Sequence, residues 1–217
     1  MKITDDHIAQ SIEALGAIGR EFHGRGWSLG TSSNYSIVLS RSPVRLLITA
    51  SGKDKGRLST DDFVIVDEWG KQVDGGPGAK PSAETLLHVV AARQPLIGSV
   101  LHTHSTWATC LSERYHSAGA MAIKGYEMLK GLEGIKTHDH TERIKIFENT
   151  QDIAALAAEL QSLMQAGEPT LRFGFLLRRH GLYTWGRDCI EARRHVEIFE
   201  FLFEVIGRSL LLGNVPL

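Results

Sequence analysis

Gly98-Ser-Val-Leu-His-Thr-His104 is a short β-rich segment that ends in two histidines one residue apart. On a strand, side chains at positions i and i+2 point to the same side, so His102 and His104 can direct their imidazoles to one point. His180 stands in a similar context, shortly after the apolar run Phe173-Gly-Phe-Leu-Leu177. Three neutral imidazoles with a fourth position left open form the ligand set of a catalytic divalent metal such as zinc. We therefore predict that these histidines hold one metal ion, which polarises a substrate oxygen.

The alternative interpretation of the histidine pair is surface polarity. The chain has 10 His, and an isolated H-x-H pair is more often a coincidence than a metal site. A second predicted strand end, which carries His180, favours the metal. Spacing alone does not bring His180 beside the pair.

Length and composition indicate one globular unit. With 217 residues, 42% of them hydrophobic and 23% charged, we expect a single domain over residues 1–217 with a sizeable core. With a net charge of -1, the protein has no overall positive potential that would attract nucleic acid or an anionic membrane, so neither is expected as a partner. Cys110 and Cys189 form no disulfide framework, the first residues carry no apolar signal segment, and no run approaches about 20 apolar residues. The expected compartment is the cytoplasm.

Helical and strand-like patterns alternate irregularly along the chain. Apolar residues recur at helical spacing in residues 4–23, 151–166 and 188–212, and a shorter helix is expected from Ser82, its predicted cap, to Ala92. Strand-like runs lie at 35–40, 46–49, 63–67, 99–102, 144–147 and 173–177. We expect further short helices at 106–111 and 124–130, and a loop at 180–185. This order predicts an α/β fold, a three-layer αβα domain with a central, largely antiparallel (mixed) sheet.

Three small polar loops could bind an anion: Gly30-Thr-Ser-Ser-Asn34, Thr49-Ala-Ser-Gly52 and Pro81-Ser-Ala-Glu84. The first two offer hydroxyls and a glycine, and the third offers N–H groups at a helix N-terminus, where the helix dipole favours anions. Each loop alone is better explained as ordinary turn or cap chemistry, whereas the three together make a phosphate pocket plausible. None matches a P-loop or a G-x-G-x-x-G motif, so no nucleotide cofactor is expected.

Two glutamates are the candidates for proton transfer. By itself, Glu84 is explained as a carboxylate that the helix dipole favours in a first turn, and Glu127 as a solvated helical residue. A carboxyl that protonates a hydroxyl near neutral pH needs a raised pKa, from desolvation or from a like charge.

The ordered set of these motifs resembles the class II aldolase/adducin family over nearly the whole chain. It consists of Gly30-Thr-Ser-Ser-Asn34, Thr49-Ala-Ser-Gly52, Lys80-Pro-Ser-Ala-Glu84, His102-Thr-His104 and Arg179-His-Gly181. The resemblance implies a nine-stranded, largely antiparallel sheet and a homotetramer with C4 symmetry whose sites lie at subunit interfaces. It also implies one Zn2+ per subunit on His102, His104 and His180. The substrate phosphate would lie near Ser32, Ser33, Asn34, Ser51, Gly52 and Ser82.

Within the family, three segments are similar to the branch that dehydrates 5-methylthioribulose 1-phosphate to 2,3-diketo-5-methylthiopentyl 1-phosphate in methionine salvage. They are Ile48-Thr-Ala-Ser-Gly-Lys-Asp-Lys-Gly56, Glu127-Met-Leu-Lys-Gly-Leu132 and Arg179-His-Gly-Leu-Tyr-Thr-Trp-Gly186. In that branch the position of Glu127 is the acid/base, whereas in the aldolases it is the position of Glu84. Both are glutamates here, so their division of labour stays open. A sugar-phosphate aldolase, a pentulose-phosphate 4-epimerase and a non-catalytic, adducin-like interaction module are the alternatives.

Overall fold

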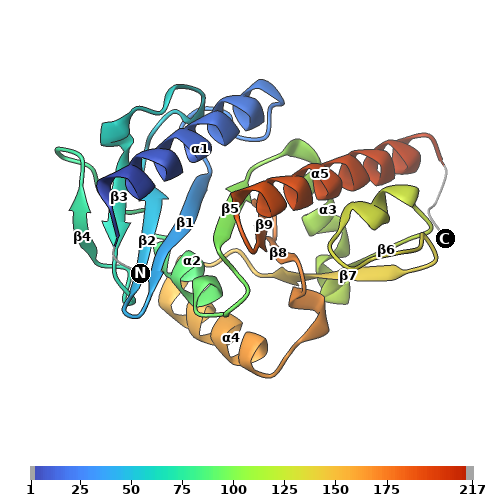
Figure 1. Cartoon of the computed structure of the whole chain (residues 1–217). Helices are drawn as coiled ribbons and strands as arrows, with labels where there is room; N and C mark the ends of the chain where they lie inside the picture. The colour runs from blue at the N-terminus through green and yellow to red at the C-terminus, as the bar shows by residue number, and fades with distance from the viewer. Residues whose placement is uncertain (1–2, 214–217) are drawn as a thin grey trace.

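A single continuous sheet forms the centre of the protein. The structure, a computed structural model, describes residues 3–213. Within them, nine strands form a sheet in the order β4-β3-β2-β1-β5-β9-β8-β7-β6 (Figure 1). The strands are β1 Asn34–Arg41, β2 Val44–Thr49, β3 Phe63–Val66, β4 Gln72–Gly75, β5 Ser99–Thr103, β6 Ala120–Lys124, β7 Thr141–Phe147, β8 Gly174–Leu177 and β9 Gly181–Gly186. Neighbouring strands are antiparallel except β7 and β8, which run parallel.

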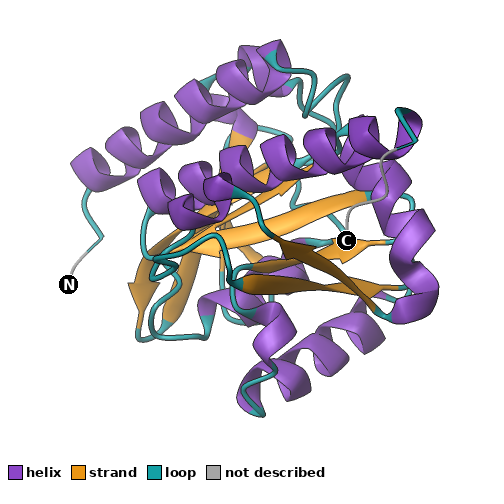
Figure 2. Ribbon diagram, turned by 90° about the vertical axis from the view of Figure 1, so that its right-hand side faces the viewer, coloured by secondary structure: helices purple, strands orange, loops and turns teal. Residues whose placement is uncertain are grey.

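Helices cover both faces of this sheet (Figure 2). The helices α1 (Asp5–Gly24), α3 (Thr106–Tyr115) and α5 (Cys189–Leu211) lie on one face, and α2 (Thr85–Ala92) and α4 (Ile153–Gln165) lie on the other (Figure 1). The apolar stripe of α5 packs on α3 and on β6 to β9, while α2 and α4 pack together on β5, β8 and β9. The predicted three-layer αβα fold with a mixed, largely antiparallel sheet is confirmed.

Short polar side chains begin the helices, as their sequences indicate. The Thr4 hydroxyl accepts a hydrogen bond from His7 N, and the Asp188 carboxylate accepts one from Glu191 N at 2.8 Å. Such caps satisfy backbone N–H groups that have no partner inside the helix. The helix α2 differs from the prediction, because Glu84 is its N-cap residue, and the Ser82 hydroxyl accepts from Glu84 N.

Two further local predictions were wrong. Residues 180–185 were expected to be a loop, but Gly181–Gly186 is β9, which pairs with β5 and β8 and is buried along its whole length. Burial on both faces removes the alternation of polar and apolar residues by which an exposed strand is recognised. The helix expected at 124–130 is instead the end of β6 followed by a 3-10 turn at Glu127–Gly131.

The order of the central strands brings distant polar residues together. Asn34 at the start of β1 pairs with His102 near the end of β5, and His102 pairs with Tyr183 of β9. A Cβ at Gly181 would collide with the Thr103 carbonyl, so β9 can approach β5 this closely only with a glycine at that position. Residues from three parts of the sequence therefore lie together at one end of these central strands.

Among residues 3–213, every helix is too short or too polar to span a membrane.

Candidate metal centre and anion pocket

The three predicted histidines meet at the ends of β5 and of the β8–β9 turn. The Nε2 atoms of His102 and His104 are 2.7 Å apart, and the Nε2 atom of His180 lies 3.3 Å from the former and 3.1 Å from the latter. This is the group of potential metal ligands found among the described residues. The structure thus supplies the contact between His180 and the pair that spacing alone could not give.

Each imidazole is fixed by its surroundings. His102 is wholly buried, and the ring of Tyr183 stacks on it at a centroid distance of 3.8 Å. His104 follows β5, and its backbone N–H donates to the Trp27 carbonyl. His180 follows Arg179, whose φ of +53° is in the left-handed region and turns the chain toward the other two rings.

The tautomers of two rings follow from their outer hydrogen bonds. His102 Nδ1 lies 2.9 Å from the Leu182 carbonyl and His180 Nδ1 lies 3.3 Å from Asn149 Oδ1, both of which can only accept. Each Nδ1 therefore carries the proton, and each Nε2 presents a lone pair to the centre of the group. Lone pairs that face each other at 3.3 Å without a proton between them repel, and a cation between them removes the repulsion. The donor set fits a divalent metal, with the outer hydrogen bonds typical of ligating histidines.

Burial keeps these imidazoles neutral, as metal ligation requires. It lowers the pKa of His102 well below the usual value, with further lowering by His104 and His180. It lowers the pKa of His104 to about 3, with smaller effects of His180 and of the ammonium of Lys55. The pKa of His180 is also lowered by burial, although the Glu84 carboxylate opposes the change.

A small cavity opens beside the histidines. Its volume is about 150 Å³, and His104 and His180 form part of its wall. The rest of its lining includes every residue that was predicted to lie near a phosphate: Ser32, Ser33, Asn34, Ser51, Gly52 and Ser82. Ser33 has a φ of +70°, and Ser33 and Arg179 are the two non-glycine residues with positive φ in residues 3–213. Backbone strain is thus concentrated in the loops of this site.

Glu84 also lines this cavity and lies beside the histidines. Its Oε1 is 3.4 Å from His180 Nε2, and its Oε2 is 3.7 Å from His102 Nε2. The Asn34 side-chain amide donates to Oε2 at 2.9 Å. Burial and the Glu84 carboxylate also raise the pKa of Tyr183. A carboxylate at this position can exchange a proton with a molecule held in the cavity or add a ligand to the metal.

Glu127 lies elsewhere in this chain. It is not among the residues that line the cavity, and its side chain is 68% exposed. It forms an ion pair with Lys130, and its Oε2 lies 3.4 Å from His138 Nδ1. The hydrogen bond from Lys130 lowers the pKa of Glu127, whereas a proton donor near neutral pH needs a raised one. One chain by itself therefore does not bring Glu127 to the histidines.

The sequence analysis missed several residues that lie next to the histidines and Glu84. Tyr183 was noted only as part of the segment from Arg179 to Gly186, and Asn149 and His88 were not singled out. Lys55 is also wholly buried, and burial lowers its pKa to about 8. The available signal was a polar residue inside an apolar run, as with His88 in Leu86-Leu-His-Val-Val90.

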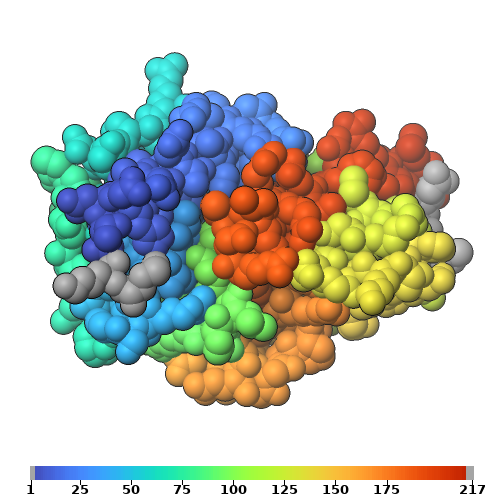
Figure 3. All heavy atoms as spheres, viewed as in Figure 1, coloured from blue at the N-terminus to red at the C-terminus, as the bar shows by residue number. Residues whose placement is uncertain are grey.

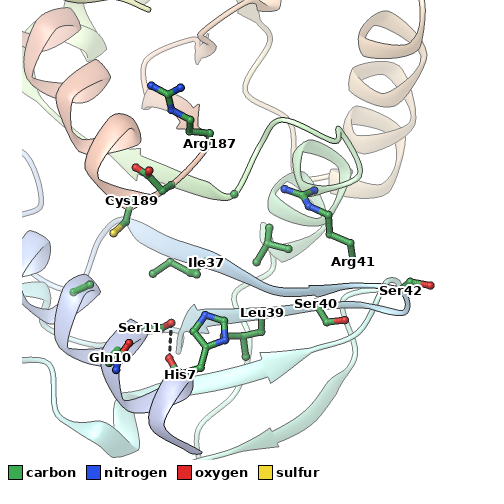
Figure 4. A pocket seen from close by; sticks show the side chains of 14 residues that line it. His7, Gln10, Ser11, Ile37, Leu39, Ser40, Arg41, Ser42, Arg187 and Cys189 are labelled. Carbon is green, nitrogen blue, oxygen red and sulfur yellow. Dashed lines mark hydrogen bonds between the residues drawn. The ribbon is translucent and has the colours of Figure 1, made fainter. Parts of the chain in front are cut away.

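A larger cavity lies on the other side of β1. It has a volume of about 610 Å³ and lies between α1, β1 and the beginning of α5, where Figure 3 shows a hollow between the blue and the orange-red surfaces. His7, Ile37 and Cys189 are among its lining residues (Figure 4). The guanidinium of Arg41 donates to the carbonyls of Ala92, Gln94 and Ile97, so three of its five N–H donors are already used. Size alone does not mark the candidate site, because the predicted ligands line the smaller cavity.

Known proteins resemble this chain over almost its entire length. The family model described as Class II Aldolase and Adducin N-terminal domain matches residues 13–206. Methylthioribulose-1-phosphate dehydratase of Pseudomonas fluorescens (strain Pf0-1) is 47% identical over 205 residues, which cover 94% of each chain. The protein with the same name from Pseudomonas aeruginosa (strain UCBPP-PA14) is 46% identical over 211 residues, covering 97% of this chain and 100% of the relative.

The fold has a counterpart among solved structures. YgbL from Escherichia coli superposes with a TM-score of 0.76 at 24% identity, and the match covers 93% of this chain and 90% of that one. At this identity the similarity concerns the fold alone. The family match and the relatives that are 46–47% identical place the chain in the class II aldolase and adducin family.

Proposed function

We propose that this protein is a zinc-dependent hydro-lyase that converts 5-methylthioribulose 1-phosphate to 2,3-diketo-5-methylthiopentyl 1-phosphate in methionine salvage. The relatives named methylthioribulose-1-phosphate dehydratase support the substrate and the reaction. The observation that carries the proposal is the convergence of three Nε2 atoms, 2.7–3.3 Å apart, beside a cavity lined by small polar residues.

The proposed substrate matches the two halves of the site. The hydroxyls of Ser32, Ser51 and Ser82 and the N–H groups around Gly52 would hold the phosphate, with the N-terminus of α2 adding a favourable dipole. The ketose would then extend from the phosphate toward the histidines. His102, His104 and His180 would hold the zinc ion, which when bound supplies a Lewis acid for the C2 carbonyl.

Proton transfer is assigned to the two glutamates. The Glu84 carboxylate, within 3.7 Å of two histidines, would take the proton from C3. The electron pair of the broken C3–H bond would then form the double bond between C2 and C3. Protonation of the C4 hydroxyl by Glu127 would then release water and leave an enol that tautomerises to the 2,3-diketone. Because Glu127 is exposed and away from its own cavity, we propose that it acts on the site of a neighbouring subunit.

This assignment depends on assembly. We propose a homotetramer with sites at subunit interfaces, in which contact with a neighbour would replace the Lys130 ion pair of Glu127 and raise its pKa by desolvation. The continuous nine-stranded sheet supports the proposal that residues 1–217 form one class II aldolase-like domain. We propose the cytoplasm as its compartment.

An activity assay of the purified protein distinguishes this reaction from the aldolase alternative. Incubation of the zinc-loaded protein with 5-methylthioribulose 1-phosphate should give a product lighter by one water, which mass spectrometry detects. The same preparation with dihydroxyacetone phosphate and an aldehyde should give no condensation. Condensation without dehydration would assign the site to an aldolase, which also uses a metal and a glutamate at the position of Glu84.

A further inference from the structure

A row of buried polar residues lies behind Glu84. The Ser36 hydroxyl is 2.8 Å from His88 Nδ1, His88 Nε2 contacts Asn34 Oδ1, and Asn34 Nδ2 is 2.9 Å from Glu84 Oε2. Ser36 and His88 are wholly buried, and Asn34 is 5% exposed. These residues come from β1 and α2, which are about 50 residues apart in the sequence.

The chemistry of each group gives the row one direction. An ionised Glu84 can only accept, so Asn34 turns its amide N–H to Glu84 and its carbonyl oxygen to His88. His88 must then donate from Nε2. Burial lowers the pKa of His88 to about 3, so the ring is neutral and its Nδ1 has a lone pair. Ser36 is left as the donor to Nδ1. Every donor in the row points toward Glu84.

Because of this row, the two carboxylate oxygens of Glu84 have different contacts. Oε2 is held by Asn34, whereas Oε1 faces His180, a residue of the cavity wall, at 3.4 Å. We propose that Ser36, His88 and Asn34 are positioning residues that fix the Glu84 carboxylate so that Oε1 is the atom that exchanges a proton with the substrate. This inference rests on the proposed function, in which Glu84 is the base.

Packing alone does not explain a histidine at position 88. Its neighbours Leu87, Val89 and Val90 are buried apolar residues of α2, and an apolar side chain would fill the site without any polar group to satisfy. A buried polar row costs stability unless each member has its partner, and here each member has one. A fully bonded row stiffens the group at its end, which suits a catalytic carboxylate that must hold its orientation.

Three variants separate positioning from packing. His88→Leu removes both hydrogen bonds of the ring, whereas His88→Gln keeps a side-chain amide that can donate to Asn34. His195→Leu is the matched control, because His195 is 2% exposed and bonds Trp185 O and Glu133 N without contacting Glu84. All three are measured as zinc-loaded proteins for zinc content, Tm, kcat and KM with 5-methylthioribulose 1-phosphate.

We expect His88→Leu to lower kcat about 10- to 100-fold with zinc content unchanged, and His88→Gln to recover it to within about threefold of the wild type. His195→Leu should lower Tm to a similar degree and leave kcat within about twofold of the wild type. The inference is overturned if His88→Gln is as slow as His88→Leu while both bind zinc, or if His195→Leu lowers kcat equally.

A measurement without substrate keeps the test independent of turnover and of variant folding. Nitrogen NMR of the imidazoles in the zinc-loaded wild-type protein should show His88 with Nε2 protonated and Nδ1 unprotonated, the tautomer that the row requires. A proton on Nδ1 would overturn the inference even in an active enzyme. If the protein fails to dehydrate the substrate, the proposed function falls, and the tautomer still decides whether the row is directed toward Glu84.

Discussion

Glu200 offers a stability test of the buried centre of the protein. It lies on α5, is 2% exposed, and its Oε1 accepts a hydrogen bond from the hydroxyl of Thr103, the residue between the first two histidines. Its Oε2 has no hydrogen-bond partner within residues 3–213. Burial raises the carboxyl pKa from 4.5 to about 7, against the lowering effect of the Ser105 and Thr103 hydroxyls.

The raised pKa fixes the sign of the pH dependence. Between about pH 4.5 and pH 7 the unfolded chain releases the Glu200 proton and the folded chain keeps it, so the free energy of unfolding falls as pH rises. At about 1.4 kcal/mol per pH unit, the loss reaches about 3 kcal/mol above pH 7. Glu200→Gln keeps an oxygen for Thr103 and cannot ionise. The variant should therefore be more stable than the wild type at pH 8 and nearly equal at pH 4.5.

Thermal unfolding at the two pH values measures this difference. For a chain of this length, about 3 kcal/mol corresponds to a Tm higher by about 6–12 °C at pH 8. Glu204→Gln is the control, because Glu204 lies on the same helix, is 43% exposed and pairs with Arg208. It should change stability by less than about 0.5 kcal/mol. A Glu200→Gln variant that is no more stable than the wild type at pH 8, or equally stabilised at both pH values, would show that ionisation of Glu200 does not limit stability.

Other substitutions test the site directly. His104→Ala should lose stoichiometric zinc, since it removes one of three ligands, and unchanged zinc by elemental analysis would contradict the metal assignment. Glu127→Gln should keep its zinc and lose about 100-fold or more of kcat, because a general acid contributes about 10²–10⁴-fold, and a normal kcat would exclude that role. Ser82→Ala should raise KM for the sugar phosphate about fivefold with kcat nearly unchanged, the effect of one neutral hydrogen bond. An unchanged KM would remove Ser82 from the phosphate site.

Much of the fold could be predicted from local patterns. The apolar spacing of α1, α4 and α5, with Thr4 and Asp188 as caps, is independent of what the helices pack against. The missed strand β9 lacks such a pattern, because it lies at the centre of the sheet and is buried on both faces. β9 can be identified as a strand only from its pairing with β5, which is a property of the tertiary structure.

The candidate site divides in the same way. The spacing of His102 and His104 is a local property, and the two imidazoles point to the same side because His104 directly follows β5, which ends at Thr103. The approach of His180 depends on Gly181, which allows β9 to pack against the Thr103 carbonyl, and no spacing rule gives that contact. The row behind Glu84 was missed because His88 and Ser36 look like ordinary residues of a helix and a strand until the two elements are packed together.

A metal held by these three imidazoles is proposed to drive the loss of water from a ketose phosphate. Product formation from 5-methylthioribulose 1-phosphate can be measured before chelation, after removal of the metal, and after return of zinc. We expect dehydration in the first and third cases and none in the second. Equal dehydration after complete metal removal, or none from the fully zinc-loaded protein, would rule out this role of the metal.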